Sequence, residues 1–136
     1  MSEDHDAAAA AQTPYELLGG DTAVRTLVER FYALMDSEPA YAVIRRLHAA
    51  DLAQARDKLY WYLSGWLGGP NLYIERFGHP MLRARHLPFS IGGAERDAWL
   101  ACMTQAMRET GVPTALHESL AAAFFKTADW MRNRRE

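Results

Sequence analysis

Residues 68–99 read GGPNLYIERFGHPMLRARHLPFSIGGAERDAW, and this stretch decides how the rest of the chain is interpreted. Its prolines, Pro70, Pro80 and Pro88, exclude one long helix, and its first half has neither helical nor strand periodicity. Its many apolar side chains argue against disorder. A loop-rich segment of this length in a small helical protein is usually functional, so we expect it to fold over something.

Helical periodicity dominates on both sides of this stretch. Apolar residues recur there at three- and four-residue spacing, which is typical of helices with one buried face. We see no convincing strand pattern and no internal repeat, so the predicted fold class is all-α. The predicted helices cover about 21–36, 37–47, 51–67, 94–110 and 113–132.

Local signals predict where the first helices begin. Thr13 and Glu16 form a capping-box pattern around Pro14, and this pattern predicts that a short helix begins there. A Gly-Gly pair then ends it. Asp21 is expected to cap the helix that follows, and Asp51 is expected to open the helix over 51–67.

The bulk properties describe one ordinary globular domain. The chain has 136 residues and a formal net charge of −2, which gives no electrostatic reason to expect nucleic acid or a membrane as partner. Cys102 is the only cysteine, which excludes an internal disulfide and a thiolate cluster. The start of the chain lacks the apolar run of a signal peptide. We expect a disordered tail over 1–13, one domain over 14–136 and a cytoplasmic protein.

Among the five histidines, His86 differs in its setting. It lies beside Arg85 and before a Leu-Pro-Phe break, where an imidazole can point into a cavity while arginines reach its rim. No second ligand lies at a metal-binding spacing, so a zinc or di-iron site is poorly supported. A single histidine is nevertheless what a haem iron uses on its proximal side. From the residues alone, a structural histidine remains the simpler interpretation.

Five segments of the chain form a recognisable set: FY at 31–32, WLGGP at 66–70, RFGHP at 76–80, LRARHLPF at 82–89 and ERDAWL at 95–100. Through these segments the chain resembles the truncated haemoglobins, specifically group II, over about residues 14–132. This family implies a two-over-two sandwich of helices around haem b, with a mostly extended loop before the proximal histidine. Such a loop would account for the missing periodicity after Pro70.

The resemblance assigns roles to four residues around the iron. His86 takes the position of the proximal ligand, and Tyr32 takes that of the distal tyrosine. Trp99 matches the tryptophan typical of group II, whose indole N–H points at bound ligand. His48 falls at a turn position where relatives carry Tyr, Phe or His. Each of the last three also has an ordinary structural interpretation, as a boundary or core residue.

The resemblance also implies contacts with the rest of the haem. Ala55 is small, so no histidine would gate the distal side of the haem at this position. Leu59 keeps the distal side apolar. Lys58, Arg85 and Tyr73 are the expected partners of the propionates. The residues expected to pack on the macrocycle are Leu63, Phe77, Phe89 and Ile91.

The predicted donors indicate what the pocket does. O–H and N–H groups stabilise a diatomic ligand that gains negative charge, and Tyr32, Trp99 and His48 supply up to three of them. We therefore expect an oxygen-binding haemoprotein that is a monomer or homodimer. The alternative is a redox enzyme on the same scaffold, peroxidase-like or detoxifying nitric oxide, which needs a separate reductase. A cofactor-free helical interaction module is the third interpretation.

Overall fold

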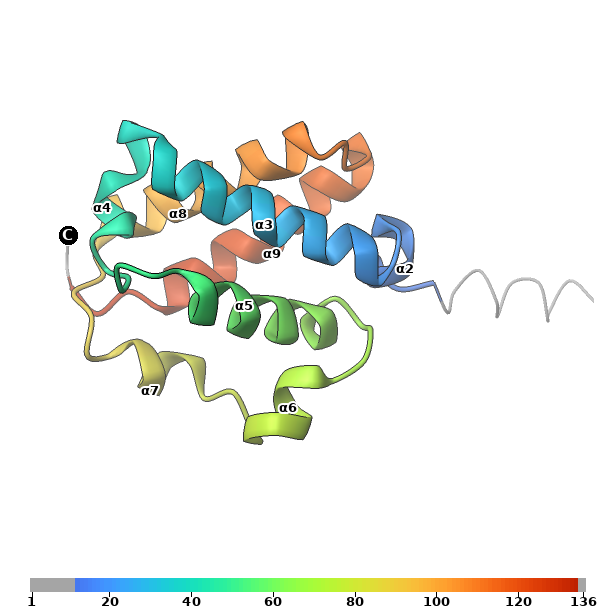
Figure 1. The fold of residues 1–136 in the computed structure, drawn as a ribbon, viewed down its shortest axis with the longest axis horizontal. Coiled ribbons are helices and arrows are strands. Elements are labelled where there is room, and N and C mark those ends of the chain that lie inside the picture. Colours follow the sequence, from blue (N-terminus) through green and yellow to red (C-terminus); the bar gives the residue numbers. More distant parts are fainter. Residues whose placement is uncertain (1–11, 135–136) are drawn as a thin grey trace, which may run out of the picture.

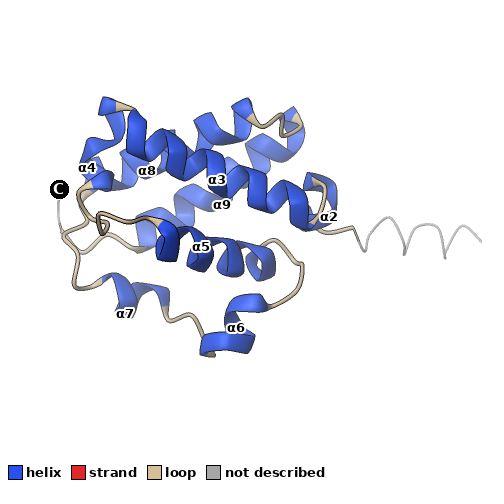
Figure 2. Cartoon of the chain, viewed as in Figure 1, coloured by secondary structure: helices blue, strands red, loops and turns tan. Residues whose placement is uncertain are grey.

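The helices that periodicity predicts are present, with their ends shifted by one to a few residues. The computed structural model describes residues 12–134, and within that range it contains helices and no strand (Figures 1 and 2). No helix in this range combines the length and the apolar character that a membrane crossing requires. The elements are α2 (Pro14–Leu18), α3 (Asp21–Ser37), η1 (Pro39–Tyr41), α4 (Ala42–Arg45), α5 (Ala53–Trp66), α6 (Leu72–Phe77), α7 (Leu82–His86), α8 (Gly93–Glu109) and α9 (Thr114–Trp130).

The first helix begins as the capping-box pattern predicts. The Glu16 backbone N–H donates to Thr13 Oγ1 at 3.1 Å, and the Thr13 N–H donates to the Glu16 carboxylate at 3.0 Å. Each contact satisfies an N–H that the helix itself leaves unpaired. Most of the expected disordered tail over 1–13 lies outside the described residues, but Thr13 belongs to the folded part.

The prediction that Asp21 caps α3 is wrong. Gly20 occupies the cap position with φ at 83°, a conformation that favours glycine, and Asp21 is the first helical residue. Its carboxylate instead accepts hydrogen bonds from the Tyr60 hydroxyl and from Arg25 Nε. The bond from Tyr60, followed by that from Arg25, lowers the pKa of Asp21. This contact ties the start of α3 to α5.

The main core lies between two pairs of long helices. α3 packs on α5 and α8, and α8 packs on α9, so the chain forms the expected two-over-two sandwich (Figure 1). α3 is central, and burial of each large apolar side chain stabilises it by about 1.5–3 kcal/mol. Its buried residues are Val24, Leu27, Val28, Phe31, Tyr32, Leu34 and Met35, and they face Cys102, Met103, Ala106 and Met107 of α8.

The segment after Pro70 is not mostly extended, so that expectation is wrong. It contains α6 and α7, which have only six and five residues. Helices this short show no repeating apolar stripe in the sequence and are not stable alone. Contact with α5 supports α6, where the Tyr73 ring meets Tyr62 at a centroid distance of 6.3 Å. Tertiary packing therefore produces helices that periodicity does not reveal.

Candidate functional site

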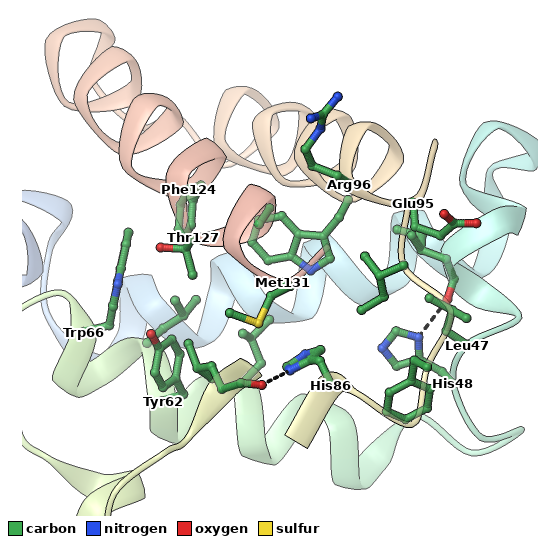
Figure 3. A pocket seen from close by; sticks show the side chains of 18 of the residues that line it. Leu47, His48, Tyr62, Trp66, His86, Glu95, Arg96, Phe124, Thr127 and Met131 are labelled. Atoms are coloured by element: carbon green, nitrogen blue, oxygen red, sulfur yellow. Dashed lines mark hydrogen bonds between the residues drawn. The ribbon is translucent and has the colours of Figure 1, made fainter. Parts of the chain in front are cut away.

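A cavity of about 240 Å³ lies between α5 and α7 on one side and α8 and α9 on the other (Figure 3). Its lining is mostly apolar, and it collects side chains from both layers of the sandwich. The predicted site residues that line it are Tyr32, His48, Leu59, Leu63, His86, Phe89, Ile91 and Trp99.

His86 is the last residue of α7, and its ring lines the cavity (Figure 3). Its Nδ1 lies 2.6 Å from the Leu82 carbonyl oxygen, one turn earlier in the helix. A carbonyl oxygen only accepts hydrogen bonds, so Nδ1 carries a proton, and in the neutral form of the ring the lone pair lies on Nε2. Outer acceptors fix the tautomer of metal-binding histidines in the same way. The ring is therefore prepared to bind a metal through Nε2.

Tyr32 brings a protonated hydroxyl to the cavity from α3. The residue is only 6% exposed, and its ring meets Phe31 edge-on at a centroid distance of 5.0 Å. Burial, together with the nearby Cys102 thiol, raises the pKa of Tyr32 far above its ordinary value. Within residues 12–134 the hydroxyl has no hydrogen-bond partner. Its O–H is thus available to a ligand in the cavity.

His48 follows α4 and lies edge-on to Tyr32, with the ring centroids 5.7 Å apart. Its Nδ1 lies 2.9 Å from the Ile44 carbonyl oxygen, so this nitrogen also carries a proton. Burial lowers the pKa of His48, and the positive charge of Arg45 adds to this effect. The neutral ring therefore presents Nε2 as a hydrogen-bond acceptor.

Trp99 contributes an indole from α8. The side chain is half-buried, with its ring 5.3 Å from that of Phe31 and 5.5 Å from that of Phe124. These contacts fix the ring against the core on both sides. Indole nitrogen only donates, so Trp99 is the second fixed donor on the cavity wall.

The other predicted residues lie outside this cavity. Lys58 is exposed on α5, and Ala55 is half-buried on the same helix. Phe77 is 44% exposed and contacts the Tyr73 ring. The Arg85 guanidinium lies 5.9 Å from the Tyr73 ring centroid, and its Nε donates to the Pro80 carbonyl. Tyr73 lines a neighbouring hollow of about 560 Å³, which shares several wall residues with the cavity.

The side chains present suit a haem better than a bare metal ion. No group of three or more His, Cys, Asp or Glu side chains able to hold an ion occurs among residues 12–134. A zinc or calcium site draws on several such ligands. Haem iron, by contrast, is held by one proximal imidazole in an apolar pocket, and His86 offers an imidazole with its Nδ1 engaged by a carbonyl in such a cavity.

Sequence reasoning missed several residues of the cavity wall. Thr127 and Met131 continue the apolar face of α9 beyond Phe124, so helical spacing alone would have found them. Arg96 also lines the wall and donates to Asp129 at 2.8 Å, which joins α8 to α9. No local pattern predicts this last contact, because the partners lie far apart in the sequence.

Comparison with known proteins gives a consistent result. The family model described as bacterial-like globin matches residues 13–133. The group 2 truncated haemoglobin YjbI of Bacillus subtilis is 41% identical over 123 residues, which cover 90% of this chain and 90% of that protein.

Solved structures agree in fold as well as in sequence. The group II 2-on-2 haemoglobin of Agrobacterium tumefaciens is 48% identical, with a TM-score of 0.88 over 93% of this chain and 97% of that one. A truncated oxygen-avid haemoglobin of Bacillus subtilis is 40% identical, with a TM-score of 0.82 over 90% of this chain and 100% of that one. The chain therefore belongs to the group II truncated haemoglobins of the bacterial-like globin family, and it is a haem-dependent, ligand-binding globin.

Proposed function

We propose that the chain holds haem b through His86 Nε2 and binds oxygen beside Tyr32 and Trp99. The observation that carries this proposal is the 2.6 Å hydrogen bond between His86 Nδ1 and the Leu82 carbonyl. It fixes the tautomer whose lone pair lies on Nε2, as a proximal ligand requires. Haem iron, when bound, supplies the coordination position for a diatomic ligand.

The two fixed donors stabilise the ligand in different ways. The Tyr32 hydroxyl is buried and protonated, so it donates a hydrogen bond as negative charge develops on the ligand. Trp99 donates through its indole N–H from a ring held by Phe31 and Phe124. Because both rings pack against the core, ligand binding requires little rearrangement of either donor.

His48 lies edge-on to Tyr32 and offers an acceptor rather than a third donor. Its Nδ1 proton is engaged by Ile44, so its Nε2 accepts, and this reduces the expected set of three ligand donors to two. His48 and Tyr32 are not hydrogen-bonded to each other, although their ring centroids lie 5.7 Å apart. The single proton of the Tyr32 hydroxyl is therefore left for the ligand.

The remaining assignments concern the macrocycle and its propionates. We assign Leu59, Leu63, Phe89 and Ile91 to apolar contacts with the ring, since all of them line the cavity. Tyr73 lines the neighbouring hollow, and the Arg85 guanidinium lies 5.9 Å from its ring centroid, so we assign this hydroxyl and this cation to a propionate. We assign Lys58, which is exposed on α5, to the same role. Phe77 contacts the Tyr73 ring, and we assign it to a contact with the macrocycle.

Absorption spectra of the purified protein test the proposal. We expect about one haem per chain, a Soret band, a five-coordinate ferrous form and a distinct carbon-monoxide form. A relative described as oxygen-avid has 40% sequence identity, and the two buried donors suggest similarly tight oxygen holding here. A colourless protein that takes up no haem on reconstitution would overturn the proposal and favour a helical interaction module.

A further inference from the structure

The helix that carries His86 has little support from the hydrophobic core. α7 has five residues and buries none of them. The chain that follows is also exposed, with Leu87 at 54% and Phe89 at 41%. A helix of this length is not stable alone. Contacts from elsewhere must therefore fix the backbone of His86.

Asn133 provides these contacts from the segment that follows α9. Its side-chain Nδ2 donates to the Phe89 carbonyl at 2.7 Å and to the His86 carbonyl at 3.3 Å. Its Oδ1 accepts from the Ile91 backbone N–H at 2.9 Å. The opposite amide orientation would place oxygen against two carbonyl oxygens and nitrogen against an N–H, so the assignment is unambiguous.

Neighbouring contacts hold the same two segments together. The backbone N–H of Asn133 donates to the Ile91 carbonyl at 2.9 Å. Arg134 reaches Ser90 Oγ at 2.8 Å, and Arg83 of α7 donates to the Arg132 carbonyl at 3.2 Å. Residues 132–134 accordingly lie beside the connection between α7 and α8 (Figure 1). Met131, two residues before Asn133, is buried and lines the cavity.

We propose that Asn133 is a positioning residue for His86. Its amide holds the backbone on the C-terminal side of the imidazole, while the Leu82 carbonyl orients the ring from the N-terminal side. Asn133 touches no reacting atom and acts only through His86. The inference rests on the proposed role of His86 as haem ligand.

Substitutions at Asn133 separate its donor contacts, to the His86 and Phe89 carbonyls, from its acceptor contact with the Ile91 N–H. Asn133→Ala removes all side-chain contacts. Asn133→Asp keeps an acceptor for the Ile91 N–H but turns a carboxylate oxygen toward two carbonyl oxygens, so it should disturb the loop more than alanine does. Asn133→Gln retains the amide on a longer side chain and should restore part of the effect. Asn71→Ala is the matched control, because Asn71 is exposed and its side chain does not cap α6.

The first measurement is hydrogen–deuterium exchange on the haem-free protein. Asn133→Ala should speed exchange over residues 81–91 about tenfold, the factor that corresponds to the net contribution of one or two hydrogen bonds. Exchange in α3 and the melting temperature should remain close to those of the parent. Asn71→Ala should leave residues 81–91 unchanged. Unchanged exchange over 81–91 in both Asn133→Ala and Asn133→Asp would overturn the proposal.

The second measurement uses the haem-loaded protein, with two readouts that do not depend on activity. In Asn133→Ala and Asn133→Asp, the ferrous iron–histidine stretching band should shift or broaden, and haem transfer to excess apoglobin should be several-fold faster. Faster exchange with an unchanged band and transfer rate would overturn the positioning role and leave Asn133 a purely structural residue. A parent that takes up no haem would overturn the proposed function as well, so the two failures are distinguishable.

Discussion

The two sides of the cavity differ in what holds them in place. Tyr32 belongs to α3, a helix of 17 residues with seven of them buried, and Trp99 lies on α8 against Phe31. His86 belongs to α7, which buries no residue. The donors proposed to face the ligand are thus part of the core. The proposed iron ligand depends instead on hydrogen bonds to a short, exposed helix.

This difference suggests how such a globin combines rigidity with cofactor entry. Donors fixed by the core keep their direction without the cofactor, so they are ready when a ligand arrives. A segment with few buried contacts opens at lower free energy than the core does. We therefore expect the α7 side of the cavity to open more easily than the donor side.

The largest expected effect comes from removing a core side chain on the donor side. Phe31 is fully buried, so Phe31→Ala should lower the unfolding free energy of the haem-free protein by about 3–5 kcal/mol. Phe89→Ala, on the 41% exposed side chain near His86, should lower it by less than about 1 kcal/mol. Urea denaturation of both variants measures the contrast. Equal losses would mean that the two sides are equally supported.

The next effect concerns ligand release rather than folding. Tyr32→Phe removes a buried hydroxyl that has no partner among the described residues, so the haem-free protein should keep its stability. A hydrogen bond to a charged acceptor contributes about 1.5–3 kcal/mol, so oxygen release should be about 10- to 100-fold faster. Stopped-flow release measures this rate. Tyr41→Phe is the control, since its hydroxyl bonds Gln105 and does not line the cavity.

Trp99→Phe should have a smaller effect in the same assay. The Trp99 indole is only half-buried, whereas Tyr32 is buried, so solvent weakens its bond to the same ligand. We expect a contribution of about 0.5–1.5 kcal/mol, which corresponds to oxygen release roughly 2- to 10-fold faster. The phenylalanine ring retains most of the contact with Phe31 and Phe124. Release at the parental rate would remove Trp99 from the set of stabilising donors.

The smallest effect is expected at Cys102, in the core between α3 and α8. Burial raises the pKa of this thiol to about 12, and its Sγ lies 3.3 Å from the Phe31 carbonyl oxygen. The folded thiol should therefore not react with a disulfide reagent at pH 8, whereas the thiol in urea should react fully. Because the folded pKa is raised, stability from this group is complete below the unfolded pKa of about 8.5 and declines as pH rises toward 12. Rapid labelling of the folded protein would show that the core opens readily.

The sequence predicts the donor side far better than the His86 side. α3 and α9 carry apolar residues at helical spacing, and this pattern places them within a few residues of their observed ends. α6 and α7 escape detection because they are too short to show a period and rely on tertiary contacts. Asp21 is misassigned because Tyr60, distant in the sequence, competes for its carboxylate.

The candidate site shows the same limit. Chemistry singles out His86 as unusual, but only the resemblance to the family connects it with haem. The contacts of Asn133 join residues more than forty positions apart, so no local sequence pattern predicts them. The family alone predicts roles for Arg85 and Tyr73, and their proximity to each other is visible only in three dimensions.

The most direct test of the central claim is haem binding by His86→Ala, with His117→Ala as control. His117 is half-buried on α9 and does not line the cavity. We expect His86→Ala to lose most of its haem or its histidine-ligated ferrous spectrum, and added imidazole to restore that spectrum. His117→Ala should match the parent. An His86→Ala protein with parental haem stoichiometry and an unchanged ferrous spectrum would contradict the assignment of His86 as the iron ligand.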